Sequence, residues 1–349
     1  MDMKLRIPLL KLISETAGTS GFEKRIRDVI IKEITPNVDS ITVDNMGNIV
    51  AFRKGKDSKK IMLAAHMDEI GFIVSHIDDN GFIRFIPLGG FDPKTLTSQR
   101  VIVHGKKDIV GVMGSKPIHL MSDDERTKAM KITDYYIDLG MKHDEVIEIV
   151  SIGDAITRER ELIEMGDCIN GKSLDNRISV YVLIEALARL KNTELPYDTF
   201  AVFTVQEEVG LRGAQVATLQ IQPDFGLAID TTIAFDVPGS QPHEQVSKLG
   251  GGAAIKIMDS SVIADPRMVA YLKRIAGDAS ITWQPELLPA GGTDTANLQK
   301  MVKGGAIAGA ISIPTRHIHS VIEMVHKYDV SCAIALLSEA ILKIDLLEV

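Results

Sequence analysis

Runs of apolar and β-branched residues along the chain predict a set of buried strands. Such runs occupy residues 60–65, 199–205, 225–229 and 306–313, with little polar interruption. Continuous apolar runs of this length are typical of strands that are covered on both faces. Helices are expected near residues 178–190, 212–219, 266–276 and 330–342. This alternation of strands and helices predicts an α/β fold, with helices flanking a central sheet.

The chain before residue 60 predicts two helices and a hairpin. The first helix is expected near residues 8–16, and a glycine-containing stretch at 18–21 ends it. Ser20 and Glu23 have the spacing of a capping box for a second helix that continues to about Lys32. Two short strands at 40–44 and 48–53 are joined by Asn45-Met46-Gly47, which is typical of a hairpin turn.

The pattern changes between residues 71 and 163. Short strand patterns at 72–77, 82–86 and 101–112 alternate there with glycine-containing turns, and a short helix is expected at 144–150. Residues 116–131 are polar without a clear period and are expected to form a mobile loop. Repeated short strands predict a β-rich module inserted into the α/β domain. We therefore predict one domain formed by residues 1–70 and 164–349, and a second formed by residues 71–163.

Composition narrows the class of protein. The chain has 349 residues, of which 45% are hydrophobic, so it can build a substantial core. Its net charge of −8 and the lack of a basic run argue against nucleic acid as a partner. Cys168 and Cys332 are too few for a disulfide framework, which predicts a reducing, cytoplasmic location. No apolar run has the length of a membrane span, so no membrane partner is expected.

Polar residues end several of the predicted strands. His66, the pair Glu207-Glu208, Asp230 and His319 follow or terminate strands, and Asp175 opens a helix. Taken singly they have simpler roles: a partly buried histidine, a helix N-cap or a solvated turn. If the central strands are parallel, however, their ends converge on one edge of the sheet. Two imidazoles and four carboxylates there would suit two divalent ions, Zn²⁺, Co²⁺ or Mn²⁺, with one acid left to move protons.

Five segments make the chain resemble the glutamyl and tetrahedral (TET) aminopeptidases, a family of cocatalytic dinuclear metallopeptidases. They are His66-Met67-Asp68-Glu69-Ile70-Gly71, Asp175-Asn176-Arg177, the run from Val205 to Ala214, Asp230, and Arg316-His317-Ile318-His319-Ser320. The resemblance extends over nearly the whole chain. It implies a zinc-aminopeptidase-like fold with a mixed central sheet, and a dimerisation role for the inserted β-rich domain.

The resemblance also implies a role for each candidate residue. One ion, Zn²⁺ or Co²⁺ by preference, would be held by His66, Asp175 and Asp230. The second would be held by Asp175, Glu208 and His319. Glu207 would be the general base, and Asp68 would orient His66. The implied activity is removal of N-terminal residues from short peptides by metal-activated water, in a large homo-oligomer that is often a tetrahedral dodecamer.

Two points in the sequence depart from the family pattern. His317 stands where the family usually has tyrosine, and because His317 and His319 are two residues apart, spacing alone does not choose between them as ligand; the resemblance assigns His319. Thr295-Ala296-Asn297 follows Gly292-Thr293-Asp294 where smaller residues are commoner, which affects the shape of the substrate pocket.

Two other functions compete with peptide hydrolysis. A glycoside hydrolase would pair Glu207 with another carboxylate, but it would not need His66 and His319, and carbohydrate clefts commonly use aromatic platforms, whereas the chain has one Trp. A non-catalytic assembly protein would not need the complete set of ligand-type residues.

Overall fold

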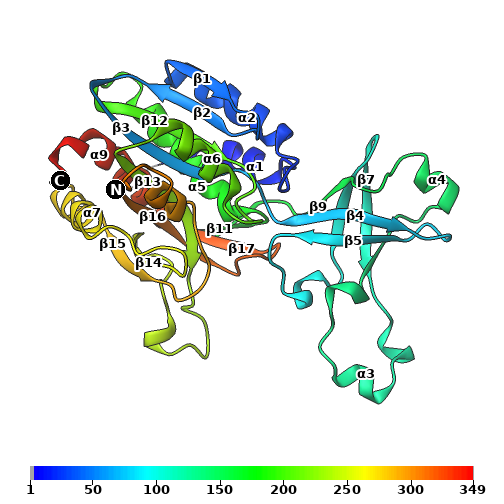
Figure 1. Cartoon of the computed structure of the whole chain (residues 1–349). Coiled ribbons are helices and arrows are strands. Elements are labelled where there is room, and N and C mark those ends of the chain that lie inside the picture. The colour runs from blue at the N-terminus through cyan, green and yellow to red at the C-terminus, as the bar shows by residue number, and fades with distance from the viewer. Residues whose placement is uncertain (1–3, 349) are drawn as a thin grey trace.

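The apolar runs form the centre of an eleven-stranded mixed sheet, and a closed barrel of β-strands lies to one side of it (Figure 1). The structure is a computed structural model that describes residues 4–348. The central sheet has the order β1-β2-β12-β3-β13-β16-β17-β11-β10, and β14 and β15 extend it from β16. The predicted α/β class, with a mixed sheet and a separate β-rich part, is therefore confirmed.

The strands of the large sheet have the following bounds: β1 Ser40–Val43, β2 Ile49–Arg53, β3 Gly55–His66, β10 Ile163–Met165, β11 Cys168–Gly171, β12 Leu195–Thr204, β13 Phe225–Ile233, β14 Ala253–Met258, β15 Trp283–Leu287, β16 Ile307–Arg316 and β17 Glu323–His326. The helices that pack on this sheet are α1 Ile7–Glu15, α2 Lys24–Ile34, α5 Leu174–Leu190, α6 Arg212–Ile221, α7 Pro266–Asp278, α8 Thr295–Lys300 and α9 Lys327–Leu342.

Alternate residues of the central strands enter two different cores. Ile61, Leu63 and Ala65 of β3 pack in the larger core with α1, α2, α5, α7 and α9. Met62 and Ala64, which point to the opposite face, pack in a second core with α6 and α8. Because successive side chains of a strand alternate between faces, an uninterrupted apolar run is what a sheet covered by helices on both sides requires.

The register of the parallel strands brings their carboxyl ends to one edge. Strands β12, β3, β13 and β16 are mutually parallel neighbours, and Thr204 at the end of β12 pairs with His66 at the end of β3. Ala228 of β13 pairs with Ala64, so Asp230 lies level with His66. This edge is where open parallel sheets bind their ligands.

The barrel is built from β4 Gly71–Ile77, β5 Ile83–Leu88, β6 Arg100–His104, β7 Asp108–Gly114, β8 Tyr136–Asp138 and β9 Ala155–Arg158. Its interior is a separate core that includes Phe72, Val101, Val103 and Ile137. Arg25 of α2 binds both carboxylate oxygens of Asp108 in β7, at 2.6 and 2.8 Å, and so links the barrel to the helical layer. Two short helices, α3 Asp123–Thr127 and α4 His143–Ile147, belong to its connecting segments.

Two local predictions were wrong. Residues 116–131 contain α3, whose N-terminus has a capping box formed by Ser122 and Glu125, because that serine and glutamate satisfy each other's backbone N–H groups. Ser20 and Glu23 do not cap α2, which begins at Lys24 without a side-chain cap. Their side chains turn instead toward the end of the central sheet, where they bind Asp68 and the backbone of Gln206.

Within residues 4–348, every helix is too short or too polar to cross a membrane.

Candidate active site

Five segments meet at the carboxyl edge of the parallel strands. His66 is the last residue of β3, Glu207 and Glu208 follow β12, and Asp230 lies within β13. His319 follows β16, and Asp175 lies in the first turn of α5, where Asp175 and Asn176 have non-helical backbone angles. The structure therefore brings together all five predicted ligands and the proposed base, from positions up to 253 residues apart (319 minus 66) in the chain.

The imidazole of His66 faces three carboxylates. Its Nε2 lies 3.4 Å from Asp175, 3.7 Å from Asp230 and 3.8 Å from Glu207. The His66 side chain is buried, and each of the three carboxylates is almost so. A single imidazole proton cannot bond three carboxylates, so the geometry is better suited to a cation shared among these groups.

Asp175 lies between the two imidazoles. Its Oδ1 is 3.4 Å from Nε2 of His66, and its Oδ2 is 3.4 Å from Nε2 of His319. Nε2 of His319 also lies 3.3 Å from Oε2 of Glu208. His319, and not its neighbour His317, therefore reaches Asp175.

These residues have the arrangement of metal ligands. Ligand atoms within 4.8 Å of one another form two groups, His66-Glu207-Asp230 and His66-Asp175-Glu208. Two donors bound to one tetrahedral ion at about 2.0–2.1 Å are about 3.3 Å apart, which is close to the separations found here. In addition, Oε1 of Glu208 is buried with no hydrogen-bond partner among the described residues. Imidazole and carboxylate donors suit Zn²⁺, Co²⁺ or Mn²⁺, so the residues present fit such ions.

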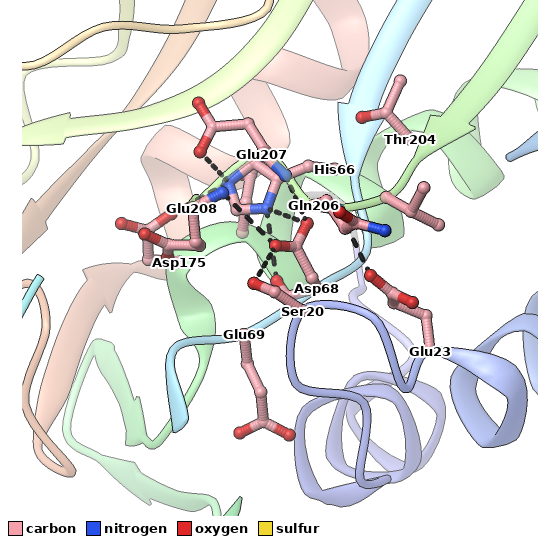
Figure 2. A network of polar contacts seen from close by, with 12 residues as sticks. Ser20, Glu23, His66, Asp68, Glu69, Asp175, Thr204, Gln206, Glu207 and Glu208 are labelled. Carbon is pink, nitrogen blue, oxygen red and sulfur yellow. Dashed lines mark hydrogen bonds and ion pairs between the residues drawn. The ribbon is translucent and has the colours of Figure 1, made fainter. Parts of the chain in front are cut away.

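Asp68 supports this arrangement on the Nδ1 side of His66 (Figure 2). Its carboxylate accepts hydrogen bonds from Ser20 Oγ at 2.7 Å and from the backbone N–H groups of Glu207 and Glu208 at 3.0 and 3.3 Å. It also lies 3.4 Å from Nδ1 of His66. One buried carboxylate thus fixes the far nitrogen of the imidazole and the turn that carries both glutamates, as outer partners of metal-binding histidines do.

Electrostatics at this edge favour a bound cation. Burial raises the pKa of Glu207 and of Asp230 well above their ordinary values, and neighbouring carboxylates add to the effect. Burial alone would lower the pKa of His319, but Asp175 and Glu208 raise it to about 11. Without a bound metal ion, these groups therefore retain protons. A divalent cation would displace those protons on binding.

A cavity of about 500 Å³ opens beside these residues. Apolar side chains line part of it, including Leu211, Ile233, Leu288 and Ile318. Lys256 reaches the same cavity, and its ammonium pairs with Glu286 at 2.5 Å and Asp259 at 3.1 Å. The size suits a small ligand such as one or two amino-acid residues.

Sequence reasoning missed several residues of the site. Asp294 is buried, accepts a hydrogen bond from Thr204 Oγ1 at 2.6 Å, and has a pKa that burial raises to about 6. Asn297, which the sequence singled out only for the shape of the pocket, donates to the backbone oxygen of Leu211 at 2.6 Å and so ties α8 to the segment after Glu208. Glu323 is buried against the backbone of Asp175 and His319. In the sequence, the glycine-rich turn before Asp294 was the signal that could have drawn attention to that residue. Glu323 had no such signal apart from its position four residues after His319.

The chain is similar to known aminopeptidases over most of its length. Residues 47–336 match the family model described as M42 glutamyl aminopeptidase. The chain belongs to this family. It is an aminopeptidase, and the predicted resemblance to this group is confirmed.

Three of the matched proteins cover nearly the whole chain. The lysyl aminopeptidase of Pyrococcus furiosus is 34% identical over 340 residues, which are 94% of this chain and 94% of the relative. The TET1 peptidase of Pyrococcus horikoshii, described as assembling into a tetrahedron or a large octahedral shell, is 32% identical with a TM-score of 0.87, covering 97% of this chain and 99% of that one. A structure named endoglucanase from Thermotoga maritima is 30% identical with a TM-score of 0.80, covering 97% and 99%.

Proposed function

We propose that this aminopeptidase works with two divalent metal ions and that Glu207 is its general base. The observation that carries the proposal is the position of Asp175, whose two oxygens each lie 3.4 Å from a different imidazole, those of His66 and His319. A carboxylate between two imidazoles in a buried acidic site is the arrangement expected of a ligand shared by two ions.

The ligand sets follow from these contacts. His66, Asp175 and Asp230 would hold one ion, and Asp175, Glu208 and His319 would hold the other. When bound, such ions polarise a carbonyl group and make water nucleophilic near neutral pH. We propose Zn²⁺ or Co²⁺ as the resident metals, because the donors are nitrogen and oxygen.

Glu207 would transfer the proton. Its carboxylate is buried and lies next to the cavity, and burial raises its pKa well above the ordinary value for a glutamate. A base with a raised pKa can accept a proton from water and return it to the leaving amine. Asp68 would act indirectly, because its hydrogen bond to the backbone N–H of Glu207 holds that carboxylate in place.

The substrate would be a short peptide with a free N-terminus. A cavity of about 500 Å³ has room for little more than one or two residues, which favours removal of terminal residues over cleavage within a long chain. We also propose a reducing, cytoplasmic location, because Cys168 and Cys332 are too few for a disulfide framework and both are free.

We further propose that residues 71–163 form a domain that assembles the chain into a large homo-oligomer, such as a tetrahedral dodecamer. The relative from Pyrococcus horikoshii supports this, since it is described as assembling into a tetrahedron or a large octahedral shell. Ile118 and Leu120, exposed apolar side chains in the segment 115–135 that joins β7 to β8 of the barrel, support it as well.

Glycoside hydrolysis is the second candidate, because one matched structure is named an endoglucanase. Paired carboxylates would serve both reactions. The two imidazoles around Asp175 favour the peptidase, because acid–base cleavage of a glycosidic bond requires two carboxyl groups and no imidazole.

Metal removal tests the proposal. Chelation should abolish release of a chromophore from amino-acyl substrates, and added Zn²⁺, Co²⁺ or Mn²⁺ should restore it. An N-acetylated peptide should resist while its free-amine twin is trimmed. Full peptidase activity in protein shown by elemental analysis to be free of metal would contradict the dinuclear proposal, and release of sugar from a glucan would favour the second candidate.

A further inference from the structure

Glu323 joins the two segments that carry Asp175 and His319. It is the first residue of β17 and its side chain is fully buried. Oε2 accepts a hydrogen bond from the backbone N–H of Asp175 at 2.9 Å, and Oε1 accepts one from the backbone N–H of His319 at 2.9 Å. One carboxylate therefore holds the main chain of both residues.

Both of these backbone positions need outside support. Asp175 has non-helical angles in the first turn of α5, where N–H groups lack partners within the helix. His319 has φ of 62°, in the left-handed region that residues other than glycine seldom adopt. A conformation of this kind persists where surrounding contacts fix it, and the bond to Glu323 is such a contact.

The carboxylate is mounted on a rigid part of the sheet. Strand β17 pairs with β11 on one side, Glu323 opposite Gly171, and with β16 on the other. Asn170 of β11 donates its side-chain amide to the backbone oxygens of Ile322 and Glu323, at 2.7 and 3.1 Å. The position of Glu323 is thus fixed independently of Asp175 and His319.

A buried cation from the barrel lies near this carboxylate. Arg158, the last residue of β9, is 1% exposed, and none of its three side-chain nitrogens has a hydrogen-bond partner among the described residues. Of the nearby carboxylates, Glu323 has the largest effect on the pKa of Arg158, which its negative charge raises against the effect of burial. Such a cation offsets part of the cost of burying the Glu323 carboxylate, although burial still raises the pKa of that group to about 8.

We propose that Glu323 is a positioning residue that sets the spacing of Asp175 and His319, and through it the affinity of the site for its second metal ion. The inference rests on the proposed dinuclear centre. Outer partners of metal ligands commonly contribute 10- to 100-fold to metal affinity.

Glu323→Gln tests this with little change in volume. The amide has one acceptor oxygen, so its NH₂ group must face one of the two N–H donors. Glu323→Asp keeps the charge but is one methylene shorter and cannot reach both donors. Asp329→Asn is the matched control, because Asp329 is also buried and accepts two backbone N–H bonds, from Gly250 and Gly252 at 2.8 and 2.7 Å, away from the site.

The measurement is calorimetric titration of metal-free protein with Zn²⁺, together with circular dichroism to confirm folding. In both Glu323 variants the Kd of the second equivalent should rise about 10- to 100-fold relative to wild type, with a smaller change in the first. Asp329→Asn should bind both equivalents as wild type does.

Three results would overturn the inference. One is an unchanged second Kd in Glu323→Gln, and another is an equal loss in Asp329→Asn. A wild-type affinity in Glu323→Asp would overturn the positioning role in favour of charge alone. If wild type itself bound fewer than two ions, the dinuclear proposal would fail instead, so the two failures are distinguishable.

Discussion

Glu207 and Glu208 are adjacent residues with different neighbours. Glu207 lies 3.8 Å from His66, whereas Glu208 lies 3.3 Å from His319. Glu207→Gln removes a proton acceptor but keeps the shape of the side chain, so kcat should fall about 10²- to 10⁴-fold while KM changes little. Glu208→Gln removes a charged ligand, so metal content should fall and excess ion should partly restore activity. Steady-state kinetics and elemental analysis of both variants measure these effects.

The opposite pattern would reverse the two roles. If Glu207→Gln lost metal and Glu208→Gln kept it, Glu207 would be the ligand, as its grouping with His66 and Asp230 allows. Equal metal loss in both variants would contradict a separate base at this position.

The residues that the structure brings together at this edge could be predicted, as could Asp68 beside His66, whereas Glu323 and Ser20 could not. His66, Glu207 and Glu208 follow apolar runs, so their type and place were informative. Glu323 accepts hydrogen bonds from two backbone N–H groups and Ser20 donates one to Asp68, and nothing in their local sequence distinguishes them from surface residues. Ser20 and Glu23 even fit a capping pattern, which the structure does not use because Asp68 and Gln206 compete for the same side chains.

At the level of elements, Asp329 in the first turn of α9 joins that helix to the segment before β14, because its carboxylate accepts hydrogen bonds from the backbone N–H groups of Gly250 and Gly252. Burial raises the pKa of this carboxyl to about 7, although the N–H groups of Gly250 and Gly252 oppose the shift. An unfolded chain releases this proton at about pH 3.9. Between about pH 4 and pH 7 the folded state therefore binds more protons than the unfolded state, and the free energy of unfolding falls as pH rises through this window.

The prediction is a difference between wild type and Asp329→Asn, which does not titrate. The stability of wild type relative to the variant should fall between pH 5 and pH 7, by at most about 1.4 kcal/mol per pH unit, and become constant above about pH 8. Urea unfolding of both proteins at several pH values gives this difference. A relative stability that rises with pH would mean that the two N–H bonds outweigh burial.

Elements that rely on local periodicity were well predicted, whereas those that rely on distant pairing or on a single cap were not. The apolar segment of β3 was evident, but the strand begins at Gly55 because its polar first half pairs with Leu195 and Tyr197 of β12. The short helix α3 was missed because its stability comes from the Ser122–Glu125 cap and not from an apolar face.

For the whole molecule, the sequence predicted a β-rich insertion but not its closure. Strands β4 and β9 begin and end the barrel in sequence and pair with each other, through Phe72 and Ile156. Closure depends on the register of six short strands, which alternating residues do not specify on their own.

The barrel also bears on assembly, the last property that we predict. Ile118 and Leu120, in the segment that joins β7 to β8, are 61% and 70% exposed, and burying such residues between subunits would favour association. By light scattering, the protein should have a mass well above the 38.1 kDa of one chain, and Ile118→Asp with Leu120→Asp should lower it. Ile263→Asp is the matched control, because Ile263 is equally exposed at 70% but lies just after β14 of the large sheet. Dissociation by the control alone would place the contact on the large sheet, and a monodisperse monomer of the unaltered chain would contradict assembly altogether.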